Sequence, residues 1–400
     1  MAHIEDRWER DVDGQRVRTD RYGRGDRWRA RWLDPDGQER SRSFARKIDA
    51  ERFLAGVESD KSRGLYVDPS AGRVTLAEYA RQWQAAQVHR ASTVDTFDSH
   101  LRNHILPVLG NKPIAAITRS EVQAFVKGRS QQLAPSTTAT VYAVLRMVMR
   151  AAVADRLLGA SPCERIALPK APPRDVVPLP HEAVAALVGA VPDRYRALIL
   201  TAAGTGLRQG ELFGLRRDRV DFLRRQIVVD SQLVLLARRA PYLAPPKTNA
   251  GYRTVPTPDS VLSALAEHFK QFAPATTLDD KNRPHELVLS NGKDAPISRT
   301  WFHRAVWSPA LTAVGLPKGT HFHELRHYYA SLLIDGGESV KVVQKRLGHA
   351  SADETLNTYA HLWPDSEDRT RSVVEAALLR VTGDDSTGGA VTVTRGATAL

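Results

Sequence analysis

The chain has 400 residues, 42% of them hydrophobic, with a net charge of +12 and one cysteine, Cys163. The length predicts two or three domains, the single cysteine excludes an internal disulfide, and the lack of an apolar run of about 20 residues excludes a membrane-spanning helix. The charged N-terminus has no apolar signal core, so we expect a cytoplasmic protein, and the positive charge favours a polyanionic partner.

Residues 1–65 are predicted to form a small β-rich module. The stretch 27–33 alternates between basic and apolar positions, which puts Arg27, Arg29 and Arg31 on one face of a strand. A turn at 34–37 leads to a partner strand at 39–44, residues 16–18 are expected as the third strand, and a helix follows from Ile48 to Val57. The arginine face is either simply solvated or enters a DNA major groove.

After a linker at 66–73, residues 74–168 are predicted to be helical. Thr75 and Glu78 form a capping box for the first helix. The next helices are expected from Ser92 towards Ile105, from Thr118, and from Ser136 to Ala154 with Val141, Leu145, Val148 and Ala152 facing inward. Residues 73–175 carry 14 Lys and Arg against 7 Asp and Glu. By itself, this pattern indicates only a basic helical bundle.

A proline-rich linker at 169–177 precedes a mixed region at 178–381 and a flexible tail at 382–400. Helices flank a β segment at 226–255, in which Lys247 is expected near the turn of a hairpin that returns through 253–256. Five short motifs stand out in this region: Thr-Gly-Leu-Arg at 205–208, Pro-Lys-Thr at 246–248, His-Glu-Leu-Arg-His at 323–327, Gly-His at 348–349 and Thr-Tyr at 358–359.

In order and spacing, these motifs resemble those of the tyrosine site-specific recombinase (phage integrase) family. The resemblance covers about 178–371 and extends more loosely to the helical region, while residues 1–65 are similar to the arm-type DNA-binding domain of larger integrases. It implies a mainly α multidomain protein with small β elements: an N-terminal three-stranded sheet with a helix, a helical, SAM-like core-binding bundle, and a mixed α+β catalytic domain.

The resemblance also implies a role for each motif residue. Arg208 and Arg326 hold the phosphate oxygens with forked donors that stay charged, and His323 lies on the same helical face as Arg326. His349 is a further donor or proton mediator. Lys247 is the general acid for the leaving 5′-oxygen, and Tyr359 is the nucleophile. The covalent link preserves the phosphodiester energy, so we expect no cofactor and no metal.

The partners that the resemblance implies are double-stranded DNA attachment sites of core and arm type and a homotetramer assembled on DNA. A DNA-bending host factor and a directionality factor are further expected partners. We expect integration or excision of a mobile element such as a prophage, near the bacterial nucleoid.

The string His323-Glu324-Leu325-Arg326-His327 also matches the H-E-x-x-H pattern of zinc proteases. That hypothesis needs a third ligand, such as His349 or Glu354. It places the fixed charge of Arg326 beside the metal and leaves Arg208, Lys247 and Tyr359 unexplained, so the sequence favours the recombinase.

Three further hypotheses remain open. A chromosome-dimer resolvase or invertase typically lacks an arm-binding module, and a type IB topoisomerase shares the nucleophile chemistry but does not need two classes of DNA site. An inert DNA-binding regulator is permitted by the composition, although the complete set of reactive residues argues against it.

Overall fold

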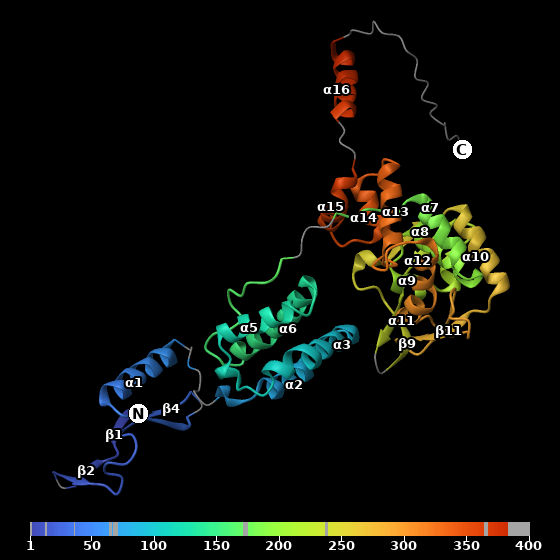
Figure 1. Ribbon diagram of the computed structural model, residues 1–400. Helices are drawn as coiled ribbons and strands as arrows, with labels where there is room; N and C mark the ends of the chain where they lie inside the picture. Colours follow the sequence, from blue (N-terminus) through green and yellow to red (C-terminus); the bar gives the residue numbers. More distant parts are fainter. Residues whose placement is uncertain are drawn as a thin grey trace. The chain divides into compact units, whose positions relative to one another are not determined.

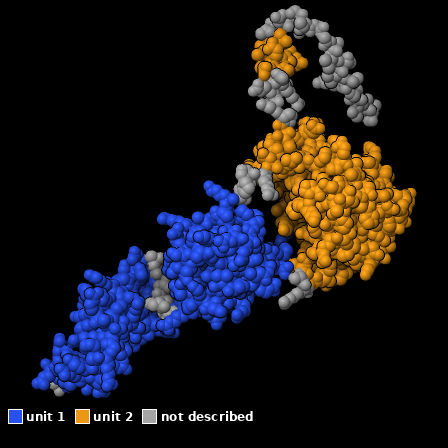
Figure 2. Space-filling view, in the orientation of Figure 1, with its two compact units in different colours: residues 1–173 blue, residues 174–400 orange. Residues whose placement is uncertain are grey.

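The computed structural model describes residues 2–12, 14–35, 37–63, 66, 71–170, 175–236, 239–363 and 367–382. The chain divides into two compact units, residues 1–173 and 174–400, each with its own packing (Figures 1 and 2). The finer division expected from the sequence stays a prediction. Much of the expected linkers at 66–73 and 169–177, and the tail beyond residue 382, lies outside the described residues.

The N-terminal part is a three-stranded antiparallel sheet covered by one helix, in the order β1 (His3–Asp6), β4 (Trp28–Leu33), β5 (Glu39–Phe44), with α1 (Lys47–Ser62). Ala30 and Trp32 of β4 are buried against α1, so the alternation in the sequence does set the two faces of this strand.

The expected third strand at 16–18 was wrong. Residues Gln15–Arg18 form β3, which pairs with β2 (Glu9–Val12) in a separate two-stranded sheet. Gly14 has a φ of +82°, which permits the tight turn that joins the two strands locally. The edge beside β4 is taken instead by β1, whose Ile4 packs on the apolar core.

The helical part of the first unit follows the predicted pattern. Its helices are α2 (Leu76–Ala86), α3 (Ala91–His100), α4 (Leu106–Leu109), α5 (Arg119–Ser130) and α6 (Pro135–Ala154). Capping boxes at Thr75 and Thr118 begin α2 and α5. The four inward positions predicted on α6 are all buried, as is Cys163.

One helix of this part departs from the prediction. The helix expected from Ser92 to Ile105 begins at Ala91 and passes through a π-helical turn at Leu101–Ile105 into the short α4. Pro107 has no backbone N–H to continue the i to i−4 bonds, which is consistent with an irregular turn at this point.

The second unit mixes helices with two sheets. Its sheets have the strand orders β10-β7-β6 and β12-β11-β9-β8, with β6 (Val220–Asp221), β7 (Gln226–Val229), β8 (Gln232–Leu236), β9 (Arg239–Ala244), β10 (Arg253–Pro256), β11 (Ala275–Asp279) and β12 (Pro284–Leu287). Its helices are α7 (His181–Ala190), α8 (Asp193–Thr205), α9 (Gln209–Phe213), α10 (Asp259–Gln271), α11 (Arg299–Phe302), α12 (Ser308–Val314), α13 (Glu324–Asp335), α14 (Val340–Leu347), α15 (Ala352–Tyr359) and α16 (Glu367–Thr382).

The hairpin expected around Lys247 was wrong. Strand β9 pairs with β8, and β10 pairs with β7 in the other sheet, so Lys247 lies in the connection between two sheets. Cross-strand packing explains the choice, because Leu243 faces Leu233 in one sheet and Val255 faces Ile227 in the other, all four buried.

A single large core joins the helices and sheets of the second unit, and its contributors run from Val184 to Tyr359. This core fixes the ends of α8, α14 and α15, where the motif residues lie. None of the described helices has the length and apolar character needed to cross a bilayer.

Candidate active site

Two arginines distant in sequence are held side by side. Arg326, in the first turn of α13, donates from Nη1 to the carbonyl of Gly206 and from Nη2 to that of Leu347, both at 2.7 Å. Arg208 donates from Nη2 to the next carbonyl, that of Gly348, at 3.0 Å. Because consecutive carbonyl oxygens bind the two guanidinium groups, the groups are neighbours, and burial together with the charge of Arg208 lowers the pKa of Arg326.

Two glycines make this arrangement possible. Gly206 ends α8 with a φ of +61°, and Gly348 ends α14 with a φ of +68°. A Cβ at Gly206 would lie 2.3 Å from Cδ1 of Tyr329, and one at Gly348 would lie 2.8 Å from the carbonyl oxygen of Ala250. Both the left-handed backbone and the close approach therefore require glycine.

Glu211 anchors Arg208 through two hydrogen bonds. Its carboxylate accepts the backbone N–H of Arg208 at 2.8 Å and the Nη1 of the same residue at 3.2 Å. Burial alone would raise the pKa of Glu211, but hydrogen bonding and charge from Arg253 outweigh burial and lower it.

Arg253 is the structural partner to which the sequence analysis gave no role. Its Nη2 lies 2.8 Å from Glu211, and its Nε donates to the carbonyl of Arg346. The only sequence signal was its place on a strand in phase with Val255, since both side chains point inward on β10. Arg253 thereby ties β10 to α9 and to the end of α14.

The two candidate histidines lie beside the arginines. His323 is the N-cap residue of α13 and lines the cavity described below, and it has no hydrogen bond within the described chain. His349 is buried, with Nδ1 2.8 Å from Oγ1 of Thr355. Burial, and then the neighbouring cations, lower the pKa of His323 to about 4 and that of His349 to about 3, so both are neutral near pH 7.

Tyr359 closes α15 with its ring only 1% exposed. Its hydroxyl lies 2.8 Å from Nδ1 of His327, and its ring stacks on that of His349 at 6.4 Å between centroids. Burial raises the pKa of Tyr359 to about 12, while the charges of Arg326 and Arg208 act in the opposite direction. Two other tyrosines lie nearby on α13: Tyr329 packs against Gly206, and the hydroxyl of Tyr328 lies 2.7 Å from Nδ1 of His181.

His361 follows Tyr359 by two residues, in the 3-10 turn Ala360–Leu362. His361 points towards the start of the unit, where its Nε2 lies 2.8 Å from the carbonyl of Val176. The histidine that bonds to the Tyr359 hydroxyl is instead His327 of α13.

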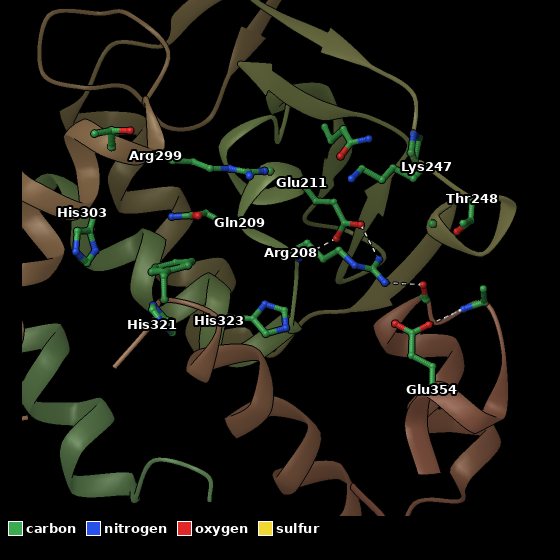
Figure 3. Close-up of a pocket in the computed structure, with 18 residues that line it drawn as sticks. Arg208, Gln209, Glu211, Lys247, Thr248, Arg299, His303, His321, His323 and Glu354 are labelled. Carbon is green, nitrogen blue, oxygen red and sulfur yellow. Dashed lines mark hydrogen bonds and ion pairs between the residues drawn. The ribbon is translucent and has the colours of Figure 1, made fainter. Parts of the chain in front are cut away.

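A cavity of about 740 Å³ opens over this group (Figure 3). Arg208, Lys247 and His323 line it, whereas Arg326, His349 and Tyr359 lie behind its wall. Figure 3 shows Lys247 and Glu354 on one side and Arg299 and His303 on the other. Of the six predicted catalytic side chains, three therefore face the cavity.

The N-terminal arginines lie in the other unit and are mostly paired. Arg27 bonds to Asp6 and Glu9 at 2.7 and 3.1 Å, and Arg31 bonds to Glu5 and Glu39 at 2.9 and 2.8 Å. No ion pair of Arg29 occurs within the described residues, in contrast to those of Arg27 and Arg31.

The geometry around the H-E-x-x-H string does not suit zinc. His327 uses Nδ1 for Tyr359, and the buried Arg326 lies between the two histidines in sequence. Across the described stretches of the chain, no three His, Cys, Asp or Glu side chains converge in a way that could hold a metal ion.

Comparison with known proteins gives consistent matches. Residues 178–365 match the phage integrase family, and residues 76–168 match the phage integrase central domain. The integrase of Mycobacterium phage D29 is 30% identical over 353 residues, which span 84% of this chain and 89% of that protein.

Solved structures show the same fold. The Tn1549 transposon integrase in complex with transposon right end DNA has a TM-score of 0.65 at 21% identity, over 76% of this chain and all of that one. The lambda integrase tetramer bound to a Holliday junction has a TM-score of 0.53 at 18% identity, over 81% of this chain and 94% of that one.

Proposed function

Because the chain belongs to the phage integrase family of tyrosine site-specific recombinases, we propose that it breaks and rejoins DNA through a 3′-phosphotyrosine bond to Tyr359. The chain is an enzyme that cleaves and rejoins DNA strands, an integrase of a prophage or another mobile element. The assignment of each step to a residue is our proposal.

The observation that carries the proposal is the pair of guanidinium groups held by the consecutive carbonyls of Leu347 and Gly348. Attack on a phosphodiester adds negative charge to the oxygens around phosphorus. Fixed arginine donors, already oriented before the reaction, stabilise that charge without reorganising. Neutral His323, with its imidazole free at the cavity, supplies a further donor to the same phosphate.

In the proposed cleavage step, the Tyr359 oxygen bonds to phosphorus and the bond from phosphorus to the 5′-oxygen breaks. The phenol proton passes to neutral His349, the proton mediator that the resemblance implies, and the charges of Arg326 and Arg208 favour the phenolate. Lys247 gives a proton to the departing 5′-oxygen. Rejoining runs the same steps in reverse with a 5′-hydroxyl of the partner strand, so the number of phosphodiester bonds is conserved.

Tyr359 has to leave its present position for this reaction. Its hydroxyl is bonded to His327, and its ring is buried behind the cavity wall. We propose that binding of DNA over the cavity shifts the end of α15, so that the hydroxyl exchanges His327 for the phosphate.

The remaining partners follow from the family. We propose core-type DNA sites for the helical domain at 74–168 and the catalytic domain at 178–381, and arm-type sites for the domain at 1–65 through Arg27, Arg29 and Arg31. Linkers at 66–73 and 169–177 would join the three domains, and the tail would begin at 382. We further propose that the chain acts as a homotetramer on DNA, together with a DNA-bending host factor and a directionality factor. It would work at the nucleoid, in the bacterial cytoplasm.

A recombination assay tests this function. Two plasmids would carry the junction sequences of the element that encodes the chain, and would be incubated with the wild-type protein and with Arg208→Ala and Arg217→Ala. The first substitution removes a proposed phosphate ligand, whereas Arg217 bonds to the carbonyl of Phe272 away from the cavity. We expect recombinants with the wild type and Arg217→Ala and none with Arg208→Ala. Binding without recombination by the wild type, with the accessory proteins present, would favour an inert regulator.

A further inference from the structure

The cavity has a second basic wall that the proposed cleavage step does not use. Arg299 begins α11, His303 follows in a π-helical turn, and His321 precedes α13, and all three are exposed to the cavity. Figure 3 shows Arg299 extending across the cavity towards the helix that begins beside Arg208. This wall therefore faces the cleavage residues across the same space.

Arg299 reaches close to α9 because residue 210 is a glycine. Its Nη2 lies 3.0 Å from the position that a Cβ at Gly210 would take, and Gly210 is two residues after Arg208. The arginine heads of the two walls thus approach the same short helix, and Gly210 leaves the space that the guanidinium of Arg299 occupies.

Charge on this wall is not balanced by protein. Arg299 has no hydrogen bond or ion pair within the described part of the chain, unlike Arg208, which is tied to Glu211 and Gly348. The cavity contains two carboxylates, of which Glu211 is bound to Arg253 and Glu354 lies on the opposite side (Figure 3). An unpaired guanidinium next to imidazole donors favours an anionic ligand.

The size of the cavity points to more than one phosphate. Its volume of about 740 Å³ is far larger than the space that one phosphate group of five atoms fills. One DNA strand carries a charge for each ~3.4 Å of helix axis, so a strand whose scissile phosphate is bound at Arg208 brings its neighbouring phosphate close to the same cavity.

We propose that Arg299, with His303 and His321, binds a phosphate adjacent to the scissile phosphate on the cleaved strand. This subsite fixes the register of the strand over the cleavage residues. The inference rests on the proposed function, because it takes DNA over the cavity as its premise.

The test is a binding experiment in the Tyr359→Phe background, which prevents cleavage. Full-length protein would be titrated with a junction duplex and with duplexes in which a neutral methylphosphonate replaces the scissile phosphate or either of its neighbours. Arg299→Ala would be compared with Arg304→Ala, its matched control. Arg304 is an exposed arginine on the following turn that lines a separate hollow with Trp301.

We expect Arg299→Ala to weaken binding of unmodified DNA and to reduce the slope of log K against log salt by about 0.9. On the duplex in which a methylphosphonate already removes the charge of the adjacent phosphate, Arg299→Ala should weaken binding hardly at all. Arg304→Ala should weaken all duplexes by one common factor, whatever its size.

An equal loss by Arg299→Ala on every duplex would overturn the inference, as would a loss confined to the junction sequence with an unchanged salt slope, which indicates a base contact. Arg208→Ala paired with the methylphosphonate at the scissile phosphate separates the two claims. A protein residue and a phosphate are coupled when removing both weakens binding by less than the two separate losses combined. If Arg208 is coupled to the scissile phosphate but Arg299 is coupled to neither adjacent phosphate, only the proposed subsite is wrong. If neither arginine is coupled to any phosphate, the proposed function is wrong as well.

Discussion

The buried pair of Glu211 and Arg253 offers a quantitative test of how the site is held together. Both side chains are almost fully buried, 4% and 3% exposed, and they are joined by two hydrogen bonds at 2.8 and 3.1 Å. Glu211→Gln keeps the shape but removes the charge, and its amide N–H₂ group then faces an arginine donor. Removing one member of a buried ion pair typically costs about 3–5 kcal/mol, because the other charge stays buried without compensation.

For a unit of this size, that loss corresponds to a fall of roughly 6–20 °C in its melting temperature. The assay is hydrogen exchange of peptides from 178–363 in the full chain across a urea series, which reports the second unit alone. Glu267→Gln is the matched control, since Glu267 is exposed and its partners among the described residues, Lys270 and Gln271, lie on its own helix. We expect the control to change the free energy of unfolding by less than about 0.5 kcal/mol.

The pH dependence gives the same test a second arm. The pKa of Glu211 is lowered in the folded protein. The ionised carboxylate therefore stabilises the folded state fully above the pKa it has in the unfolded chain, and this stabilisation is lost as the pH falls through the pKa it has in the folded protein. The difference in stability between wild type and Glu211→Gln should therefore shrink towards acidic pH. A loss below about 1 kcal/mol at neutral pH, or a difference that grows on acidification, would refute this account of the pair.

Three further outcomes are expected. In the same urea series, Gly206→Ala should destabilise the second unit more than Gly315→Ala does. Both glycines have a positive φ, but only a Cβ at residue 206 would collide with Tyr329. Equal losses of stability would contradict this contact. The pKa of His349 is about 3 in the folded protein, so on acidification the unfolded chain binds this proton first, and stability should fall as the pH drops from about 6.5 towards 4. His349→Gln should reduce the slope of the unfolding free energy against pH by up to about 1.4 kcal/mol per pH unit. An unchanged slope would contradict the lowered pKa. Lys247→Ala should slow cleavage of ordinary DNA by about 10²–10⁴-fold but not that of DNA with a 5′-bridging sulfur, which leaves without a proton; equal slowing of both would exclude it as the general acid.

Local signals in the sequence predicted most elements of the fold. Capping residues such as Thr75 and Thr118 mark helix starts through contacts within one turn, and the alternation at Ala30 and Trp32 marks a buried strand face. Such contacts depend only on near neighbours, which is why sequence alone reveals them.

Long-range pairing was the part that sequence could not give. The strands on either side of Lys247 belong to different sheets because of apolar partners about 10 and 28 residues away, such as Leu243 with Leu233 and Val255 with Ile227. The candidate site shows the same limit. Its residue types were evident from the motifs, but the bond of Tyr359 to His327 and the anchor at Arg253 depend on how separate helices pack.

The most direct test of the central claim is a covalent trapping experiment. Junction DNA with a nick placed to trap cleavage would be incubated in excess EDTA with wild-type protein and with Tyr359→Phe, followed by denaturation in SDS and mass mapping of any DNA-linked peptide. The account predicts an SDS-resistant adduct with the wild type alone, mapped to Tyr359. An adduct that persists in Tyr359→Phe, or one mapped to another residue such as Tyr328, would contradict it.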